Sequence, residues 1–163
     1  MSLAQALAIS DNIYAVKTLQ DIGYSKFNKT LEKFGLPTSD KEEQALALGT
    51  TESTLFNLTG AYNKIASYGK DVAPTTILSI KNAKGEVVYE ASKKEEKEVL
   101  SEQQAAVLTH MLSGIFDPVY NDYSPATGTG LRSKMTQTYA AKTGTTNSDQ
   151  WMIGFTPSLT AGV

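Results

Sequence analysis

The sequence contains no cysteine and a single histidine, His110. Without cysteine the chain can form no disulfide framework, no thiol nucleophile and no cysteine zinc site. One histidine leaves almost no room for a histidine-rich metal site or a Ser-His-Asp triad. We therefore expect no metal and no cofactor, and we expect any nucleophilic chemistry to use a base other than histidine.

Long apolar runs and an excess of one charge sign are also absent. The opening MSLAQALAISDN lacks a basic leader and soon reaches Asp11, so it predicts neither a signal peptide nor a membrane span. Fifteen basic and seventeen acidic residues give a net charge of −2, which argues against nucleic acid or an anionic membrane as the main partner. The 163 residues, of which 40% are hydrophobic, have the size and composition of one globular domain.

Apolar residues recur at helical spacing through residues 1–70. The polar run Ser10-Asp11-Asn12 interrupts this pattern, and its side chains are of the types that cap helices. Gly23 and Gly35 end two later stretches, since glycine readily adopts the left-handed conformation that closes a helix. The predicted helices cover residues 3–9, 13–22, 27–34 and 54–68.

Residues 71–163 mix strand and helix patterns. Runs at 75–80 and 86–90 flank Asn82-Ala83-Lys84-Gly85, which predicts a hairpin with a left-handed glycine. Ser101 and Gln104 form a capping-box pattern before a helix of about four turns. The remaining predictions are a charged connector at 92–98, an aperiodic loop at 117–137, and strands at 139–143, 151–155 and 159–163.

These patterns predict an α+β fold in which helices flank an antiparallel sheet, with a helical part over 1–70 and the hairpin, a helix and the sheet over 71–163. The chain starts inside an amphipathic segment and stops inside a strand pattern, so we expect a domain truncated at both ends. Truncation would leave apolar surface and an unpaired sheet edge, through which chains could associate.

The run Lys142-Thr143-Gly144-Thr145-Thr146 places a cation, three hydroxyls and a glycine on five consecutive positions. A cation and hydroxyl donors suit a carboxylate, and glycine lets another backbone approach closely. If the strand lies at a sheet edge, its free N–H and C=O groups can pair with an extended peptide. The run therefore predicts a groove for a peptide carboxyl terminus; the alternative is an exposed edge strand followed by a turn.

The run Ser10-Asp11-Asn12 also has two interpretations. Capping alone explains it, because all three residue types are preferred at helix N-termini. The order Ser-Asp-Asn followed by Lys-Thr-Gly is more specific. Both runs occur, together with Ser-x-x-Lys, in penicillin-binding proteins and class A β-lactamases.

The chain resembles the transpeptidase domain of a penicillin-binding protein, of the bifunctional high-molecular-weight class A that carries a glycosyltransferase module upstream. The segments that carry the resemblance are ALAISDNIYAVKTLQDIG at 6–23, ALALGTTESTLFNLTGAYNKIASYG at 45–69 and YAAKTGTTNSDQWMIGFTP at 139–157. The resemblance implies a serine β-lactamase/transpeptidase-like fold. It also implies a parent D,D-transpeptidase at the extracytoplasmic face of the bacterial membrane, whose partners are the D-Ala-D-Ala stem peptide of peptidoglycan and β-lactam antibiotics.

The resemblance implies roles for the polar residues of both runs. Ser10 would take part in a proton relay beside the nucleophile, and Lys142 would supply positive potential and complete that relay. Asn12 would hold an amide of the substrate or of the penicillin side chain. Asp11 receives no direct role.

On the predicted edge strand, the resemblance assigns substrate binding to three residues. Thr143 and Thr145 would bind the terminal carboxylate, and Gly144 would clear space for the substrate backbone. The backbone N–H of Thr145 would form one half of an oxyanion hole.

The family's nucleophile and lysine base lie in a Ser-x-x-Lys motif upstream of Ser-Asp-Asn. The one match in this chain, Ser67-Tyr68-Gly69-Lys70, lies downstream, and Gly69 is expected to end the helix that would place serine and lysine one turn apart. We therefore expect no nucleophile within these residues and no catalysis by this chain alone, whereas the parent protein should be an enzyme.

Two other functions are compatible with the sequence. A serine D,D-carboxypeptidase or β-lactamase-like hydrolase would use the same motifs but would transfer the acyl group to water. A non-catalytic peptide-binding module would use the hydroxyl-rich edge strand only to dock ligands.

Overall fold

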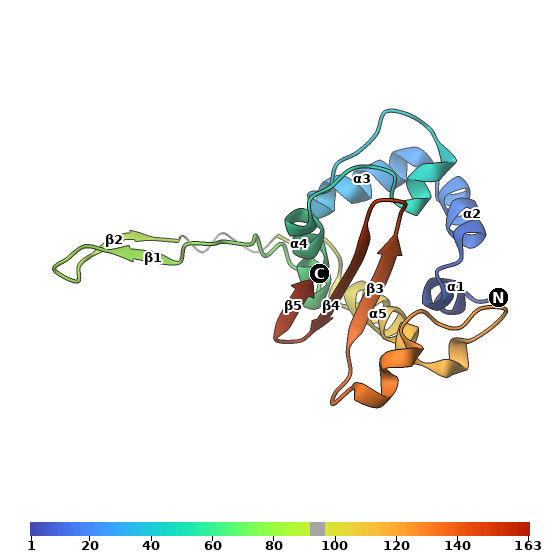
Figure 1. The fold of residues 1–163 in the computed structure, drawn as a ribbon. Coiled ribbons are helices and arrows are strands. Elements are labelled where there is room, and N and C mark those ends of the chain that lie inside the picture. Colours follow the sequence, from blue (N-terminus) through green and yellow to red (C-terminus); the bar gives the residue numbers. More distant parts are fainter. Residues whose placement is uncertain (92–96) are drawn as a thin grey trace.

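The computed structural model describes residues 1–91 and 97–163 of the chain. Residues 92–96, which form most of the charged connector predicted at 92–98, lie outside the described residues. The fold is α+β, as the sequence predicts. Helices pack against a three-stranded antiparallel sheet, and a two-stranded hairpin projects from this body (Figure 1). Among the described helices, none combines the length and the apolar character that crossing a bilayer requires.

The four helices predicted in the first half are present. They are α1 (Leu3–Ile9), α2 (Asn12–Ile22), α3 (Tyr24–Phe34) and α4 (Leu55–Ala66). Gly23 separates α2 from α3, and Gly35 closes α3 in the left-handed conformation with φ 73°. The sequence analysis missed the short 3-10 helix η1 (Gln44–Leu48), because five residues are too few to show a helical period.

Helix α4 ends two residues before the predicted boundary at residue 68. Ser67 leaves helical geometry, and Tyr68 and Gly69 follow with φ 58° and 86°. The carbonyl of Gly69 then accepts the N–H groups of Val99 at 2.8 Å and Leu100 at 3.2 Å. The end of α4 is therefore tied to the segment that leads into the next helix.

A buried lysine joins α3, α4 and the segment after α4. The Lys64 ammonium lies 2.8 Å from the Asp71 carboxylate and donates to the Lys33 carbonyl at 3.3 Å. The Lys64 side chain is 10% exposed, so its charge depends on these partners. Removing Asp71 would leave a buried charge without its counterion.

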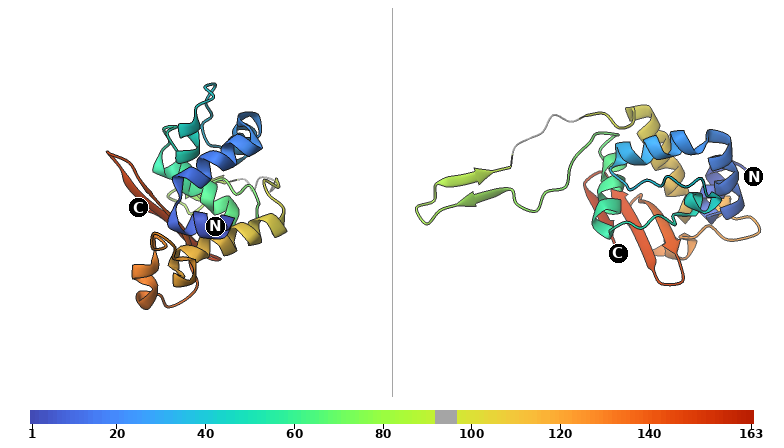
Figure 2. Two further views of the ribbon diagram at one scale, coloured as in Figure 1. Left: turned by 90° about the vertical axis from the view of Figure 1, so that its right-hand side faces the viewer. Right: turned by 90° about the horizontal axis from the view of Figure 1, so that it is seen from above.

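The hairpin forms as predicted but with a shorter first strand. β1 (Ser79–Lys81) pairs antiparallel with β2 (Val87–Glu90), and Gly85 has φ 83°. The predicted strand residues 75–78 lie outside β1, although the Leu78 carbonyl still accepts the Ala91 N–H at 2.8 Å. Every residue of both strands is exposed, and the hairpin extends away from the helices (Figures 1 and 2).

Helix α5 (Glu102–Ser113) begins at the predicted capping box. The Ser101 hydroxyl accepts the Gln104 N–H at 3.2 Å, and the Gln104 side chain accepts the Ser101 N–H at 3.0 Å. The expected four turns are reached only with the 3-10 helix η2 (Gly114–Phe116) that follows directly.

The loop predicted as aperiodic at 117–137 is more regular than expected. It contains two 3-10 helices, η3 (Pro118–Tyr120) and η4 (Thr129–Lys134). Asp117 caps η3 and Pro118 occupies its first position, a local signal that apolar periodicity does not detect. The predicted loop therefore contains two short helical turns that the sequence patterns did not predict.

The three predicted C-terminal strands form one sheet. They are β3 (Ala140–Thr145), β4 (Gln150–Thr156) and β5 (Leu159–Gly162), in the order β3-β4-β5 with antiparallel pairing. In the register between β3 and β4, Lys142 lies opposite Ile153 and Gly144 lies opposite Trp151. Among the described strands, β3 is an edge strand.

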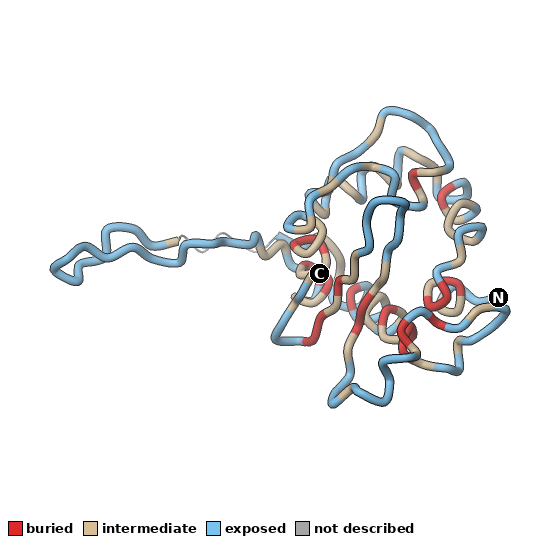
Figure 3. Tube along the Cα trace, in the orientation of Figure 1, coloured by how far each residue is buried: buried red, intermediate tan, exposed pale blue. Residues whose placement is uncertain are grey.

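Helices α4 and α5 cover one face of this sheet (Figure 2). Ile65 of α4 and Leu112 of α5 pack with Ala140 and Phe155 in a buried cluster. The buried residues concentrate where these helices, α1 and the sheet meet (Figure 3). Since α5 and η2 contact both α1 and β3, the core fixes the position of the α1 terminus relative to the edge strand.

Gly69 offers a test of how closely α4 and the lead into α5 approach each other. A Cβ on Gly69 would lie 2.1 Å from the Leu100 carbonyl oxygen. We expect Gly69→Ala to lower the free energy of unfolding by about 3 kcal/mol, from the clash and the positive φ together. The measurement is chemical denaturation of the chain.

The matched control is Gly49→Ala. Gly49 also has a positive φ, 80°, but a Cβ there would meet nothing within 4 Å. Its loss should be about 1 kcal/mol, from backbone strain alone. Equal losses at the two positions would contradict the close approach at Gly69.

Candidate active site

Ser10 follows α1 in the left-handed conformation, with φ 59° and ψ 49°. The Ser10 N–H donates to the Leu7 carbonyl at 3.3 Å, and the Asp11 N–H donates to the Ala6 carbonyl at 2.9 Å. Glycine is the usual residue at this point of such a helix end, because a Cβ costs about 1–2 kcal/mol in this conformation. Because the backbone conformation alone would favour glycine, the presence of serine indicates that the hydroxyl is needed at this position.

Asp11 caps the N-terminus of α2 and uses both of its carboxylate oxygens. Oδ1 accepts the Tyr14 N–H at 2.5 Å, so the predicted helix capping is confirmed. Oδ2 accepts the hydroxyl of Tyr123 from the loop between η3 and η4. The bonds from Tyr123 and then from Tyr14 hold the pKa of Asp11 below its usual value. Asn12 follows as the exposed first residue of α2.

Lys142 brings the two sequence motifs together. Its Nζ donates to Ser10 Oγ at 2.8 Å, across 132 residues of sequence, and to the Thr143 carbonyl at 2.8 Å. Within the described part of the chain no carboxylate forms an ion pair with Lys142. Burial lowers the pKa of the ammonium. The arrangement therefore holds a partly desolvated cation against a serine hydroxyl.

The edge strand continues past Lys142 with Thr143, Gly144 and Thr145. The hydroxyls of Thr143 and Thr145 bond to none of the described residues, which leaves them available to a ligand. A Cβ on Gly144 would meet nothing within 4 Å, so packing against the described chain does not require glycine there. Since β4 pairs with only one edge of β3, an extended ligand could pair with the other edge.

The Ser-x-x-Lys match at 67–70 lies outside this arrangement. Ser67 follows α4, and two left-handed residues separate it from Lys70. Lys70 instead forms a β-bridge with Glu98. The two side chains therefore do not share a helical turn, as the sequence predicts.

The remaining polar candidates do not form a metal site among the described residues. His110 is exposed near the end of α5, in line with a surface role. No group of three or more histidine and carboxylate side chains gathers in the described part of the chain.

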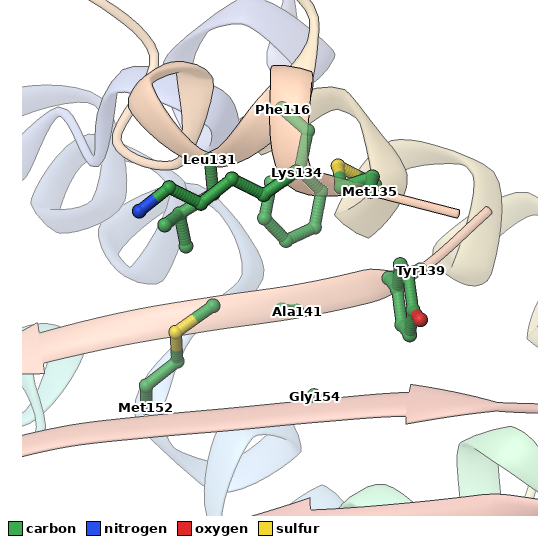
Figure 4. A pocket seen from close by; sticks show the side chains of 8 residues that line it. All are labelled: Phe116, Leu131, Lys134, Met135, Tyr139, Ala141, Met152 and Gly154. Atoms are coloured by element: carbon green, nitrogen blue, oxygen red, sulfur yellow. The ribbon is translucent and has the colours of Figure 1, made fainter. Parts of the chain in front are cut away.

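An apolar hollow of about 270 Å³ opens on the other face of β3 from Lys142 (Figure 4). Side chains alternate along a strand, so Ala141 faces this hollow while Lys142 points to the side of the helices. The lining residues are Phe116, Leu131, Lys134, Met135, Tyr139, Ala141, Met152 and Gly154. None of the predicted site residues belongs to this lining, so the candidate site is the edge of β3 beside Ser10.

Known proteins resemble the chain along its whole length. The family model described as "Penicillin binding protein transpeptidase domain" matches residues 1–162. The chain is 44% identical over 163 residues to penicillin-binding protein 2D of Bacillus subtilis (strain 168), covering 100% of this chain and 23% of the relative. It is 35% identical over 166 residues to penicillin-binding protein 1A of Aquifex aeolicus (strain VF5), covering 100% of this chain and 21% of that relative. The chain thus spans less than a quarter of the length of these relatives.

Solved structures share the fold. Penicillin-binding protein 1A from Haemophilus influenzae matches with a TM-score of 0.83 and 23% identity, over 95% of this chain and 28% of that chain. Penicillin-binding protein 3 from Mycobacterium tuberculosis, complexed with aztreonam, matches with a TM-score of 0.76 and 22% identity, over 94% and 41%. These structures confirm the predicted fold of helices and antiparallel sheet.

The left-handed conformation of Ser10 can be tested with two variants that both lack the hydroxyl. We expect Ser10→Gly to be more stable than Ser10→Ala by about 1 kcal/mol, because only alanine places a Cβ in the left-handed region. Chemical denaturation measures the difference. Ala106→Gly on the exposed side of α5 is the control, and there glycine should be the less stable residue by about 1 kcal/mol. The same sign at both positions would contradict the conformation of Ser10.

The burial of Lys142 predicts a pH-dependent stability. Because burial lowers the pKa of Lys142 from 10.5, the unfolded chain binds more protons than the folded chain between the two pKa values. The destabilisation is full below the folded-state pKa and disappears as the pH rises to the unfolded value. Relative to Lys142→Met, the wild type should therefore gain stability as the pH rises from neutral toward 10.5, the ordinary pKa of lysine.

Denaturation of both proteins across this pH range measures the change. Lys84→Met, in the exposed hairpin, shows the general effect of removing one positive charge. A difference between wild type and Lys142→Met that does not vary with pH would mean that the ammonium is not desolvated in the folded chain.

Proposed function

Because this chain belongs to the penicillin-binding protein transpeptidase family, we propose that it forms part of the transpeptidase domain of a serine-type D,D-transpeptidase. On this proposal, residues 1–163 contribute one wall of the active site. The parent protein acts at the extracytoplasmic face of the bacterial membrane, where it cross-links peptidoglycan. It is of the bifunctional class A, and the relatives named penicillin-binding protein 1A are consistent with this class.

The contact between Lys142 and Ser10 is the observation that carries the proposal. A 2.8 Å hydrogen bond joins residues from two motifs that lie 132 residues apart. The two motifs approach because the core packs α1 and β3 against the same helix, α5. A cation, a hydroxyl and an open strand edge at one place match the needs of acyl transfer.

In the proposed relay, Ser10 carries a proton between the nucleophile and the leaving amine. The lowered pKa of Lys142 suits this role, because an ammonium that releases its proton more readily can exchange it with the serine hydroxyl. The positive charge of the Lys142 ammonium stabilises the negative charge of the transition state and of the substrate carboxylate. Asn12, exposed at the start of α2, holds an amide of the substrate beside the relay.

The substrate lies along the open edge of β3 on this proposal. The hydroxyls of Thr143 and Thr145, which bond to none of the described residues, bind the terminal carboxylate, and the space over Gly144 admits the substrate backbone. The Thr145 N–H donates to the oxyanion as the tetrahedral intermediate forms. A D-Ala-D-Ala peptide bound in this way would add a strand to the sheet.

The reaction proceeds in two acyl-transfer steps. The nucleophilic serine oxygen attacks the carbonyl carbon of the penultimate D-alanine, the peptide bond breaks, and the terminal D-alanine leaves with a proton on its nitrogen. The amine of a neighbouring stem peptide then attacks the ester, forms the new peptide bond and restores the serine hydroxyl. A β-lactam undergoes the first step by opening of its ring amide, and the neighbour structure with aztreonam supports binding of this class of compound.

The nucleophile is not among the residues of this chain on this proposal. Ser67 and Lys70 do not share a helical turn, and Lys142 contacts Ser10 and not Ser67. The 163-residue chain alone is therefore inactive, and acylation requires the parent protein.

Intact-mass spectrometry after incubation with benzylpenicillin tests the proposal. We expect the parent protein to gain one covalently bound penicillin and the 163-residue chain to gain none, because the serine that forms the ester lies outside it. Parent protein with Lys142→Met should be labelled at least about tenfold more slowly, since it loses the relay cation. Its unfolding curve controls for loss of structure.

Two other outcomes would require a different conclusion. Labelling of the 163-residue chain would place a nucleophile within it, and Ser67→Ala would then be the first variant to examine. A parent protein that binds penicillin reversibly and is never labelled would exclude the transpeptidase and favour a peptide-binding module.

A further inference from the structure

The loop between η3 and η4 is attached to the α1–α2 turn on both sides of Ser10. The Thr127 N–H donates to the Ala8 carbonyl at 3.0 Å, and the Tyr123 hydroxyl donates to Asp11 Oδ2. Ala8 precedes Ser10 by two residues, and Asp11 follows it directly. The loop therefore restrains the backbone on both sides of the serine.

The loop is itself held by local bonds, so it can act as a rigid support. The Asn121 side chain accepts the Ala126 N–H at 2.9 Å, and the Asp122 N–H donates to the Ser124 carbonyl at 3.0 Å. Ala126 is 2% exposed and anchors the end of the loop in the body of the protein. Tyr123 stands on this support.

Tyr123 contributes little to the core. Its side chain belongs to neither buried cluster, and the residue is 72% exposed. Its specific attachment is the bond to Asp11, which raises the pKa of Tyr123 and lowers that of Asp11. These opposite pKa shifts are expected when a neutral phenol donates a hydrogen bond to a carboxylate anion. A tyrosine placed this way orients Asp11 without adding much to stability.

We propose that Asp11 and Tyr123 form a positioning pair that holds the Ser10 hydroxyl toward Lys142. The inference rests on the proposed function, because it concerns the same acyl-transfer site. Neither residue touches the reacting atoms. The pair acts by fixing the turn, since displacement of a catalytic group by about 1 Å can lower a rate by about a hundredfold.

Asp11 has two functions, and one substitution separates them. Serine is as good a helix N-cap as aspartate, so Asp11→Ser retains an acceptor for the Tyr14 N–H. Its single short hydroxyl cannot also reach Tyr123. Asp11→Ser and Tyr123→Phe therefore both break the pair and keep the cap.

The experiment measures acylation of the full-length parent protein by benzylpenicillin at varied concentration, which separates the acylation rate constant from the dissociation constant. We expect Asp11→Ser and Tyr123→Phe each to lower the rate constant about tenfold, with little change in the dissociation constant. The double variant should be no slower than either single variant, because both remove the same bond. Thermal unfolding should change little in all three.

Tyr120→Phe is the matched control, because Tyr120 lies close by in η3 and its hydroxyl bonds to none of the described residues. It should acylate at the wild-type rate. A wild-type rate constant in Tyr123→Phe, a loss confined to the dissociation constant, or an equal loss in Tyr120→Phe would each overturn the pair. Wild-type parent protein that is never acylated would overturn the proposed function and the pair together.

Discussion

The hydrogen bond from Lys142 to Ser10 is the constraint on which the rest of the structure depends. It requires an ammonium to lie partly out of water, where the charge is stable only with acceptors close by. Ser10 Oγ and the Thr143 carbonyl supply them, each at 2.8 Å. Because these groups come from opposite ends of the chain, the fold must hold α1 and β3 at a fixed separation. The core around α5 and η2 does so, since α1 and β3 both pack against it.

Conformational cost and hydrogen bonding are concentrated at the same turn. Ser10 adopts a conformation that favours glycine, and Asp11 has both oxygens occupied directly after it. Strain of this kind persists only where the surroundings determine the backbone, which here means the end of α1, the start of α2 and the loop that carries Tyr123. The edge of β3 is the opposite case, because the hydroxyls of Thr143 and Thr145 bond to no residue in the part of the chain that the structure describes. One side of the site is fixed, and the other side is left to the ligand.

The sequence predicted the parts of the fold that local patterns specify. The polar break at Ser10 predicts where α1 ends, Gly35 predicts where α3 ends, and the capping box at Ser101 predicts where α5 begins. Each of these signals lies within a few residues of sequence. The 3-10 helices η3 and η4 were missed because they have no apolar period. The order of the two motifs pointed to the family, but the bond between Tyr123 and Asp11 joins residues 112 positions apart that share no pattern. Such a contact depends on the packing of the whole chain.

The projecting hairpin has a consequence for how the chain unfolds. All residues of β1 and β2 are exposed, so the free energy of the core does not protect their hydrogen bonds. Their backbone amide hydrogens should exchange with solvent through local opening, whereas those of β3 and β4 should exchange only when the core opens. The hairpin also carries exposed apolar side chains at Ile80, Val88 and Tyr89. Substitutions there would alter solubility before they alter the melting temperature.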